Sequence, residues 1–361
     1  MTLSPELSAA QAHLDYVDTD AWPGYTRRRR GKGFSYHDPR GNLLRGPERD
    51  RVAALVIPPA WQEVWICPVG TGHILATGRD ERGRKQYVYH PRWNAVRQEA
   101  KYHGLVDFAE ALPSLRARVR EDLKGPPTGR ETVFARGIRL VEATLLRVGG
   151  EGYARENGSR GLTTLEKEHV HVLEDEETVI LEFTGKSGVA QSVEIDDPEL
   201  VELVLACLDT DSERVLAYED EATGELRPVT PGQLNAYIMR AMGTDHTMKT
   251  FRTWGGTVLA TSIFLGLGPC PGEGRAKTRA LTAALDQVAE RLGNTRAVCK
   301  AHYVHPGVID AYAAGTLAEL ARHRARQRDL SPEENVALGV CRELRAAAEA
   351  VAEELATTRR G

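Results

Sequence analysis

The sequence predicts an α+β protein with a small β-rich N-terminal domain, residues 1–93, and a larger, mainly α-helical domain, residues 94–361, that contains a three-stranded β-sheet. Three observations predict this division. Short apolar or alternating runs, cut by proline and glycine, occupy residues 15–92 and are typical of strands. Beyond them, apolar residues recur at three- and four-residue spacing, which is typical of helices. One stretch inside the helical part returns to strand-like alternation, and the chain ends in a helix.

Length and composition are those of a globular protein. The 361 residues are 41% hydrophobic and 27% charged, which is ordinary for such proteins. No apolar run approaches the roughly 18 residues of a membrane span, and the first 20 residues lack the basic and apolar regions of a signal peptide. Five scattered cysteines without a C-x-x-C pair indicate reduced thiols and a cytoplasmic protein, and they argue against a zinc site.

The charge is distributed unevenly along the chain. The net charge is −4, but residues 1–140 hold 23 Lys+Arg against 16 Asp+Glu, and the remainder holds 24 against 35. Such asymmetry is consistent with a part of the protein that faces a polyanion. An unevenly charged, solvated surface explains it equally well at this point.

The β-rich region contains recognisable strands and one basic segment. Residues 53–67 and 72–78 are apolar or alternating, and a turn at Glu-Arg-Gly, residues 81–83, precedes an alternating strand at 86–90. That alternation places Tyr87 and Tyr89 on one face. Five basic side chains lie within residues 26–34, namely Arg27, Arg28, Arg29, Arg30 and Lys32. They form either a solvated, flexible loop or a phosphate-binding arm, and we favour the arm.

The helical region is interrupted by a predicted sheet. Residues 94–121 and 131–147 show helical spacing, and Gly-Pro-Pro-Thr-Gly-Arg at 125–130 separates them. Residues 169–195 then predict three strands, with turns at 174–177 and 185–188. The second turn is flanked by glycines and holds Lys186 away from the sheet, although a lysine in a turn is ordinarily just solvated. Helices resume from residue 197, and the last begins with Ser331 as N-cap and Pro332 at N1 and runs to about residue 357.

Several weaker patterns carry less information. His169 and His171 alternate on a predicted strand, and we expect them to be surface or packing residues rather than metal ligands. The glycine-rich residues 266–274 follow a helix, so we expect a mobile loop rather than a phosphate loop. No Walker A lysine motif occurs, so nothing supports a requirement for ATP. We interpret Tyr312 as a helix-packing residue.

Four stretches are harder to explain as ordinary structure. Arg147 lies at the end of a predicted helix, just before two glycines, and Lys186 lies at a hairpin tip. Lys249 and Arg252 lie one helical turn apart, so both can face one side. Asn294 and Tyr303 lie in LGNTRAVCKAHYVHP, beside His302 and His305. Taken singly, an arginine is most simply a salt-bridge partner, and a tyrosine is most simply a buried ring.

Together these residue types fit one chemistry. When a tyrosine attacks a phosphodiester, negative charge builds on the non-bridging oxygens and needs positive groups beside it. Two guanidinium groups supply them as fixed donors. The leaving sugar oxygen needs a proton, which a lysine can donate. An amide or an imidazole adds a neutral donor to a phosphate oxygen. This set of groups requires no metal and no other cofactor.

The four stretches, in their order and spacing, resemble the type IB DNA topoisomerases, with the closest likeness to the short bacterial and poxvirus-like form. Residues 72–93 resemble the small N-terminal DNA-clamp domain of that family. The resemblance implies the tyrosine recombinase/topoisomerase IB catalytic fold for residues 94–361. It also implies a DNA-clamp role for residues 1–93.

Roles follow from the resemblance position by position. Arg147 and Arg252 match the two catalytic arginines, Lys186 the general acid and Tyr303 the nucleophile. Asn294 lies where many members have histidine and some bacterial ones asparagine. The resemblance further implies these DNA contacts: Arg84, Gln86, Tyr87, Tyr89, Tyr153 and Lys249.

Three features depart from the family pattern. Thr250 stands where the family often has an acidic residue, and His302 stands before the tyrosine where another type is expected. The turn at 174–177 is acidic, so we expect it to point away from the DNA.

The activity implied is relaxation of supercoiled duplex DNA through a transient 3′-phosphotyrosyl bond, swivelling and religation, without ATP or a required metal. The implied partner is duplex DNA, held by a monomer that acts as a clamp, in the bacterial cytoplasm on the nucleoid. Two alternatives remain open: a tyrosine recombinase or integrase-type strand transferase, and a non-catalytic DNA-binding protein of the same fold. Recombinases usually have His-x-x-Arg at the second arginine, whereas this chain has Lys249-x-x-Arg252.

Overall fold

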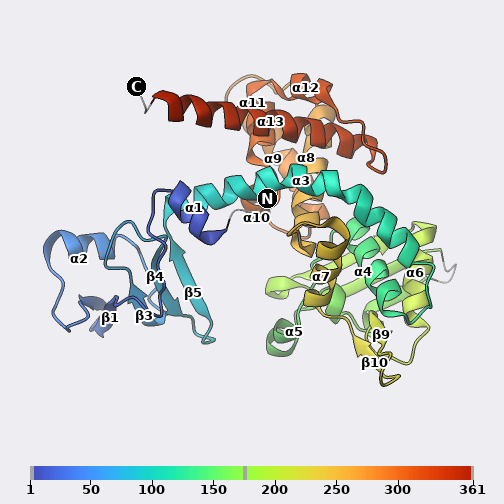
Figure 1. Cartoon of the computed structure of the whole chain (residues 1–361), viewed down its shortest axis with the longest axis horizontal. Coiled ribbons are helices and arrows are strands. Elements are labelled where there is room, and N and C mark those ends of the chain that lie inside the picture. The colour runs from blue at the N-terminus through green and yellow to red at the C-terminus, as the bar shows by residue number, and fades with distance from the viewer. Residues whose placement is uncertain (1–3, 174–176, 359–361) are drawn as a thin grey trace. The chain divides into compact units, whose positions relative to one another are not determined.

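The computed structural model describes residues 4–173 and 177–358 (Figure 1). These residues divide into two compact units, one up to residue 102 and one from residue 103 onward. The division falls inside the long helix α3 (Pro91–Asp122), which matches the helix expected over 94–121. A functional domain boundary at residue 93 stays a prediction. Among the described residues, no helix is both long and apolar enough to cross a membrane.

The first unit is built on a five-stranded antiparallel sheet with the order β2-β1-β3-β4-β5. Its strands are β1 (Tyr25–Arg30), β2 (Gly33–His37), β3 (Gln62–Ile66), β4 (Ile74–Arg79) and β5 (Lys85–Tyr89). The β-rich prediction for this region is therefore confirmed. The sequence analysis missed two short helices, α1 (Pro5–Gln11) and α2 (Gly46–Ala53). Each has Pro at its start, which is a helix signal, but both are too short to show a clear apolar period.

The basic segment is a strand rather than a flexible loop. Arg27 to Arg30 belong to β1 and pair with β2. The Arg27 guanidinium donates to the carbonyls of Ile57 at 3.0 Å and Trp61 at 2.6 Å, and its Cζ lies 4.1 Å from the centre of the Phe34 ring. Burial lowers the pKa of Arg27. This arginine therefore holds the sheet together, and a phosphate-binding role stays a prediction for its exposed neighbours.

The second unit is mainly helical. Its longer helices are α4 (Arg130–Thr144), α6 (Pro198–Leu208), α7 (Pro231–Met242), α8 (Met248–Gly266), α9 (Arg275–Arg291) and α13 (Pro332–Thr358). Shorter ones are α5 (Glu151–Asn157), α10 (Arg296–His302), α11 (Pro306–Ala314) and α12 (Leu317–Leu320). A buried apolar cluster joins α8, α9, α10 and α11, with Ala260, Val288, Cys299 and Val308 at its centre.

Two details of this unit correct the prediction. The helix expected over 131–147 ends at Thr144, because Leu145 takes a left-handed conformation with φ 56°, so Arg147 lies in an extended segment beyond the helix. The region expected to be helical from residue 197 also contains a hairpin, β9 (Ala217–Glu219) and β10 (Leu226–Pro228). Strands of three residues are too short to show a period of two.

The predicted three-stranded sheet is confirmed. Strands β6 (Val170–Val172), β7 (Val179–Thr184) and β8 (Ala190–Ile195) are antiparallel in the order β6-β7-β8. The acidic turn at 174–177 falls largely outside the described residues, so its predicted direction stays untested.

The last helix, α13, is fixed to the rest of the unit at its first turn. Ser331 caps it as predicted, since its hydroxyl accepts from the Glu334 N–H at 3.1 Å. The Glu334 carboxylate binds Arg116 of α3 at 2.8 Å and accepts from Trp254 Nε1 of α8 at 3.1 Å, and Arg116 also binds Glu142 of α4 at 2.7 Å. This largely buried cluster holds four helices together, including α8, which carries two of the predicted site residues.

Candidate active site

The structure brings the four singled-out stretches to one place. A cavity of about 740 Å³ is lined by Arg147, Lys186, Lys249, Asn294 and Tyr303. They come from the segment after α4, the β7–β8 hairpin, the start of α8 and the two ends of α10. Local sequence gave no reason for these groups to meet.

Arg147 and Asn294 form one wall of the cavity. The Arg147 guanidinium donates to Asn294 Oδ1 and, at 3.4 Å, to the Gly293 carbonyl. The Asn294 amide nitrogen donates to the Leu292 carbonyl at 3.2 Å. These bonds fix the direction of a half-buried guanidinium, which is what a fixed donor to an anion requires.

Arg252 is the most unusual charge in this region. Only 4% of the residue is exposed, and no acidic side chain in the described part of the chain forms an ion pair with it. It donates instead to the carbonyls of Leu145 and, at 2.7 Å, Leu292. Burial lowers its pKa, an effect opposed by Tyr303. A buried charge without a counter-charge is costly, so this guanidinium is suited to a bound anion.

Tyr303 lies directly against that charge. The tyrosine ends α10, its ring is half-buried, and the Arg252 Cζ lies 4.9 Å from the ring centre. Arg252 Nε is buried and has no hydrogen-bond partner among the described residues. The ring, the free Nε–H and the guanidinium charge are thus in one place.

The segment Trp-Gly-Gly-Thr after Arg252 explains how α8 reaches the tyrosine. A Cβ at Gly255 would lie 2.6 Å from the Leu145 side chain, and one at Gly256 would lie 2.8 Å from the Tyr303 carbonyl oxygen. Thr257 Oγ1 accepts from the His305 N–H at 3.1 Å. The two glycines therefore allow close approach on two sides of the helix, and the threonine fixes the turn that follows the tyrosine.

Replacement of Gly256 by alanine is expected to destabilise the protein by about 1–3 kcal/mol, as overpacking does, and to slow any reaction of Tyr303. The added methyl would push against a backbone carbonyl, which cannot rotate away. Gly266→Ala in the same helix is the control, because nothing lies within 4 Å of its Cβ position. Thermal unfolding of the two variants measures the difference, and equal stability would contradict this explanation of the glycine pair.

The two histidines beside Tyr303 differ in role. His302 is exposed and lines the cavity. His305 is buried, and its Nδ1 accepts from the Gly307 N–H at 3.0 Å, which caps α11. Tyr312 is a packing residue, as expected, since it is buried and its ring stacks on Phe264 with centres 4.4 Å apart.

The two lysines of the cavity are exposed. Lys186 lies at the β7–β8 tip, where Ser187 and Gly188 both have positive φ. Lys249 and Arg252 lie one turn apart on α8, but only the lysine lines the cavity wall, while the arginine lies beneath the tyrosine. Tyr153 on α5 is 57% exposed and is not among the residues that line the cavity.

The predicted DNA contacts of the first unit lie on or beside β5. Tyr87 and Tyr89 stack on each other with centres 5.5 Å apart and are 41% and 37% exposed, so the prediction that they share a face is confirmed. Arg84 and Gln86 both bind the Asp80 carboxylate, at 2.8 and 2.9 Å. These hydrogen bonds, above all the one from Arg84, lower the pKa of Asp80 to about 2. Their DNA contacts stay predictions.

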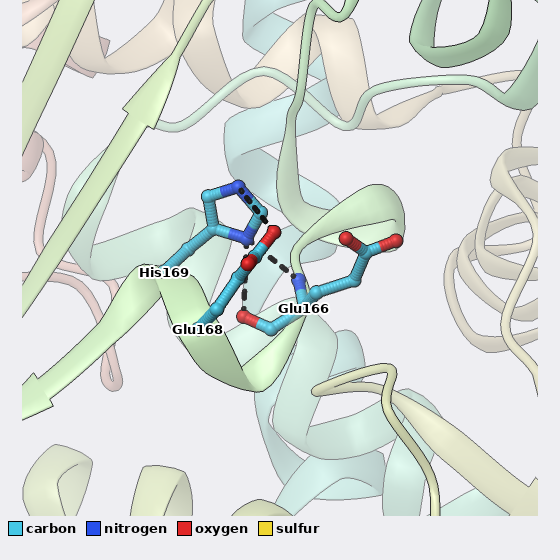
Figure 2. A group of neighbouring side chains, drawn as sticks. All are labelled: Glu166, Glu168 and His169. Atoms are coloured by element: carbon cyan, nitrogen blue, oxygen red, sulfur yellow. Dashed lines mark hydrogen bonds and ion pairs between the residues drawn. The ribbon is translucent and has the colours of Figure 1, made fainter.

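A separate cluster of charged groups surrounds His169 (Figure 2). His169 lies in a short 3₁₀ turn before β6, so the expected alternation with His171 on one strand is wrong. Glu166 and Glu168 lie close enough to share a cation with it, their ligand atoms all within 4.8 Å. However, Arg160 binds the Glu166 carboxylate through two bonds of 2.9 and 3.0 Å. We interpret this cluster as an ion-pair network that supports the segment after Arg147.

Comparisons with known proteins identify the family. The family model of the eukaryotic DNA topoisomerase I catalytic core matches residues 90–328, and that of the bacterial DNA topoisomerase IB N-terminal domain matches residues 33–80. DNA topoisomerase 1B of Acanthamoeba polyphaga mimivirus is 28% identical over 305 residues, which cover 83% of this chain and 90% of the relative. DNA topoisomerase 1B of vaccinia virus (strain Copenhagen) is 21% identical over 258 residues, 71% of this chain and 76% of the relative.

The matched catalytic core covers well over half of the chain, so the chain belongs to the type IB DNA topoisomerases. It is an enzyme of the DNA topoisomerase I class, an isomerase.

Proposed function

We propose that this protein relaxes supercoiled duplex DNA by cutting one strand with Tyr303 and rejoining it. The observation that carries the assignment of residues is the buried Arg252 guanidinium, which lies against the Tyr303 ring without a carboxylate partner among the described residues. A phosphate drawn to that charge would lie beside the Tyr303 ring. The family membership supports the reaction, and the geometry supports these residues as its agents.

The proposed reaction proceeds in two reversible transfers. The Tyr303 hydroxyl loses its proton to water as Oη attacks a backbone phosphorus, a 3′-phosphotyrosyl bond forms, and the bond to the 5′ oxygen breaks. Arg147, Arg252 and Asn294 hold the non-bridging oxygens as charge builds on them. Lys186 donates the proton that the departing 5′ oxygen takes up.

The covalent link explains why no energy source is needed. The phosphodiester energy is kept in the phosphotyrosyl bond. After the free end swivels, the 5′ hydroxyl attacks the phosphorus, the tyrosine leaves, and the strand is whole again with fewer superhelical turns. No step of this proposed reaction uses ATP or a metal ion.

We propose that residues 94–361 have the tyrosine recombinase/topoisomerase IB catalytic fold and that a monomer closes around duplex DNA as a clamp. The stacked pair Tyr87 and Tyr89 would contact DNA from the first unit, with Arg84 and Gln86 nearby. Tyr153 and Lys249 would contact it from the second. We place the protein in the bacterial cytoplasm, on the nucleoid.

The purified protein is expected to relax both negatively and positively supercoiled plasmid in EDTA without ATP. Relaxation should weaken steeply with salt, since each phosphate contact contributes a slope of about −0.9 in log K against log salt. Gel electrophoresis of the plasmid topoisomers measures both effects. A requirement for ATP or a divalent metal would contradict the proposed chemistry, and recombinant products would favour the strand-transferase alternative.

A further inference from the structure

We infer that Gln191 is a positioning residue that seats the lysine-bearing β7–β8 hairpin against the wall formed by Arg147 and Asn294. This inference rests on the proposed function, because it concerns how Lys186 is held for proton transfer. It adds a residue that the chemistry of the site did not single out.

The first observation is that Gln191 breaks the pattern of its strand. Side chains that pair across antiparallel strands lie on one face, and Gln191 pairs with Phe183, which is buried. The next inward positions of β8 are Val193 and Ile195. The alternation therefore calls for an apolar side chain at residue 191, and the sequence supplies an amide.

The second observation is that two glycines make room for this side chain. A Cβ at Gly185, directly before Lys186, would lie 2.8 Å from Gln191 Cγ. A Cβ at Gly293, directly before Asn294, would overlap Gln191 Oε1. The Gln191 side chain thus fills the space between the turn that holds Lys186 and the segment that holds Asn294. Gly185 and Gly293 leave this space open, because a side chain at either position would collide with Gln191.

The third observation is that a cavity lies on each side of the place where Gln191 meets Gly185 and Gly293. Gln191 lines the cavity of about 740 Å³ that holds Tyr303, and it also lines a second cavity of about 260 Å³, whose wall includes Gly185 and Arg252. The backbone bonds at the tip are internal to it, from the Gly185 N–H to the Val189 carbonyl at 2.8 Å and from the Gly188 N–H to the Gly185 carbonyl at 3.2 Å.

The β7 side of the tip is also held directly before Gly185, by a bond from the Arg160 N–H to the Thr184 carbonyl at 2.7 Å. That bond holds the β7 side of the tip, whereas the Gln191 side chain fills the space between the tip and the Gly293 segment. A shift of about 1 Å in a reacting group can cost up to about 100-fold in rate. The placement of Lys186 relative to the leaving oxygen is thus the property that Gln191 controls.

The test uses two duplexes that carry a cleavage site mapped on plasmid DNA, one with the natural 5′ oxygen and one with sulfur in its place. A thiol has a pKa of about 8.5, so the thiolate leaves without taking a proton from Lys186. With oxygen, the P–O bond breaks as the oxygen takes the Lys186 proton; with sulfur, the P–S bond breaks and no proton is needed.

Gln191→Ala is expected to slow single-turnover cleavage of the oxygen duplex about tenfold, part of the roughly 10²–10⁴-fold that a general acid contributes. On the sulfur duplex its rate should match that of the unchanged protein within about twofold. Lys186→Ala should show the same pattern with a larger loss. Glu182→Gln, on the exposed face of β7, is the control and should leave both rates unchanged.

A double variant tests the contact itself. Gly185→Ala alone should also slow the oxygen duplex, because its methyl displaces Gln191. Combined with Gln191→Ala it should cost nothing more, since the obstructing side chain is gone; such non-additivity is the mark of a direct contact. Additive losses would overturn the inference.

Equal slowing of both duplexes by Gln191→Ala would show a general structural role and overturn the inference, as would no slowing of either. A different result would show that the proposed function itself is wrong. In that case the unchanged protein forms no covalent adduct through Tyr303 with either duplex.

Discussion

Tyr303→Phe is expected to abolish both plasmid relaxation and covalent capture of DNA, while DNA binding remains. The phenylalanine ring keeps the contact with the Arg252 guanidinium, whose Cζ lies 4.9 Å from the ring centre, but it has no oxygen to attack phosphorus. The loss should therefore be complete rather than partial. Relaxation assays, denaturing gels and a binding titration with a short duplex measure the three properties.

Tyr312→Phe is the matched control, nine residues along the chain. The Tyr312 hydroxyl is buried and has no hydrogen-bond partner among the described residues, so its removal should leave relaxation intact and stability equal or slightly higher. Relaxation at a normal rate by the Tyr303 variant, or its loss in the Tyr312 variant, would contradict the assignment of the nucleophile.

Arg252→Lys is expected to lower the single-turnover cleavage rate by about 10²–10³-fold, the loss typical of removing one fixed donor to a developing oxyanion. A lysine keeps the charge but not the planar fork, so it cannot serve the Leu145 carbonyl, the Leu292 carbonyl and a phosphate together. An unsatisfied buried carbonyl should also cost about 1–3 kcal/mol of stability. Rapid-quench cleavage and thermal unfolding separate the two effects.

Arg240→Lys is the control for Arg252→Lys, because it makes the same arginine-to-lysine exchange at an exposed position. Arg240 is exposed on α7, where it binds Glu131 at 3.2 Å, and an exposed ion pair contributes at most about 1 kcal/mol. Its variant should cleave normally and unfold at nearly the same temperature. A normal cleavage rate for the Arg252 variant would mean that the buried guanidinium supports the fold rather than the reaction.

The fold was predictable wherever its elements are long. The helix α3, the strands β7 and β8 and the capped start of α13 all have clear periods or signals, and the three-residue β6 was predicted only together with the two strands that follow it. The short elements were missed, because α1, α2 and the β9–β10 pair give too few residues for a period. The basic run Arg27–Arg30 was expected to be either a flexible loop or a phosphate-binding arm, and its strand was missed, since charge suggests exposure and the role of Arg27 in binding loop carbonyls depends on tertiary structure.

The members of the candidate site could be singled out from the sequence, but their arrangement could not. Residue types and a family resemblance singled out Arg147, Arg252 and Tyr303. Nothing in the sequence showed that Arg252 is buried without a carboxylate, or that Asn294 binds Arg147. The sequence offers one local indication for Gln191, which is an amide at an inward-facing position of a strand. Its role can be inferred only from the structure, which places it against Gly293.

The most direct test is to identify the amino acid that becomes linked to DNA. The protein is mixed with supercoiled plasmid or a cleavable duplex, trapped with denaturant and digested with trypsin, and the DNA-linked peptide is fragmented in a mass spectrometer. Cleavage after Lys300 and Arg322 gives a peptide that contains both Tyr303 and Tyr312. We expect the phosphate on Tyr303 and the label of a 5′-labelled strand in the adduct. Linkage through Tyr312, through any other residue, or to the 5′ end of the break would contradict the proposed mechanism.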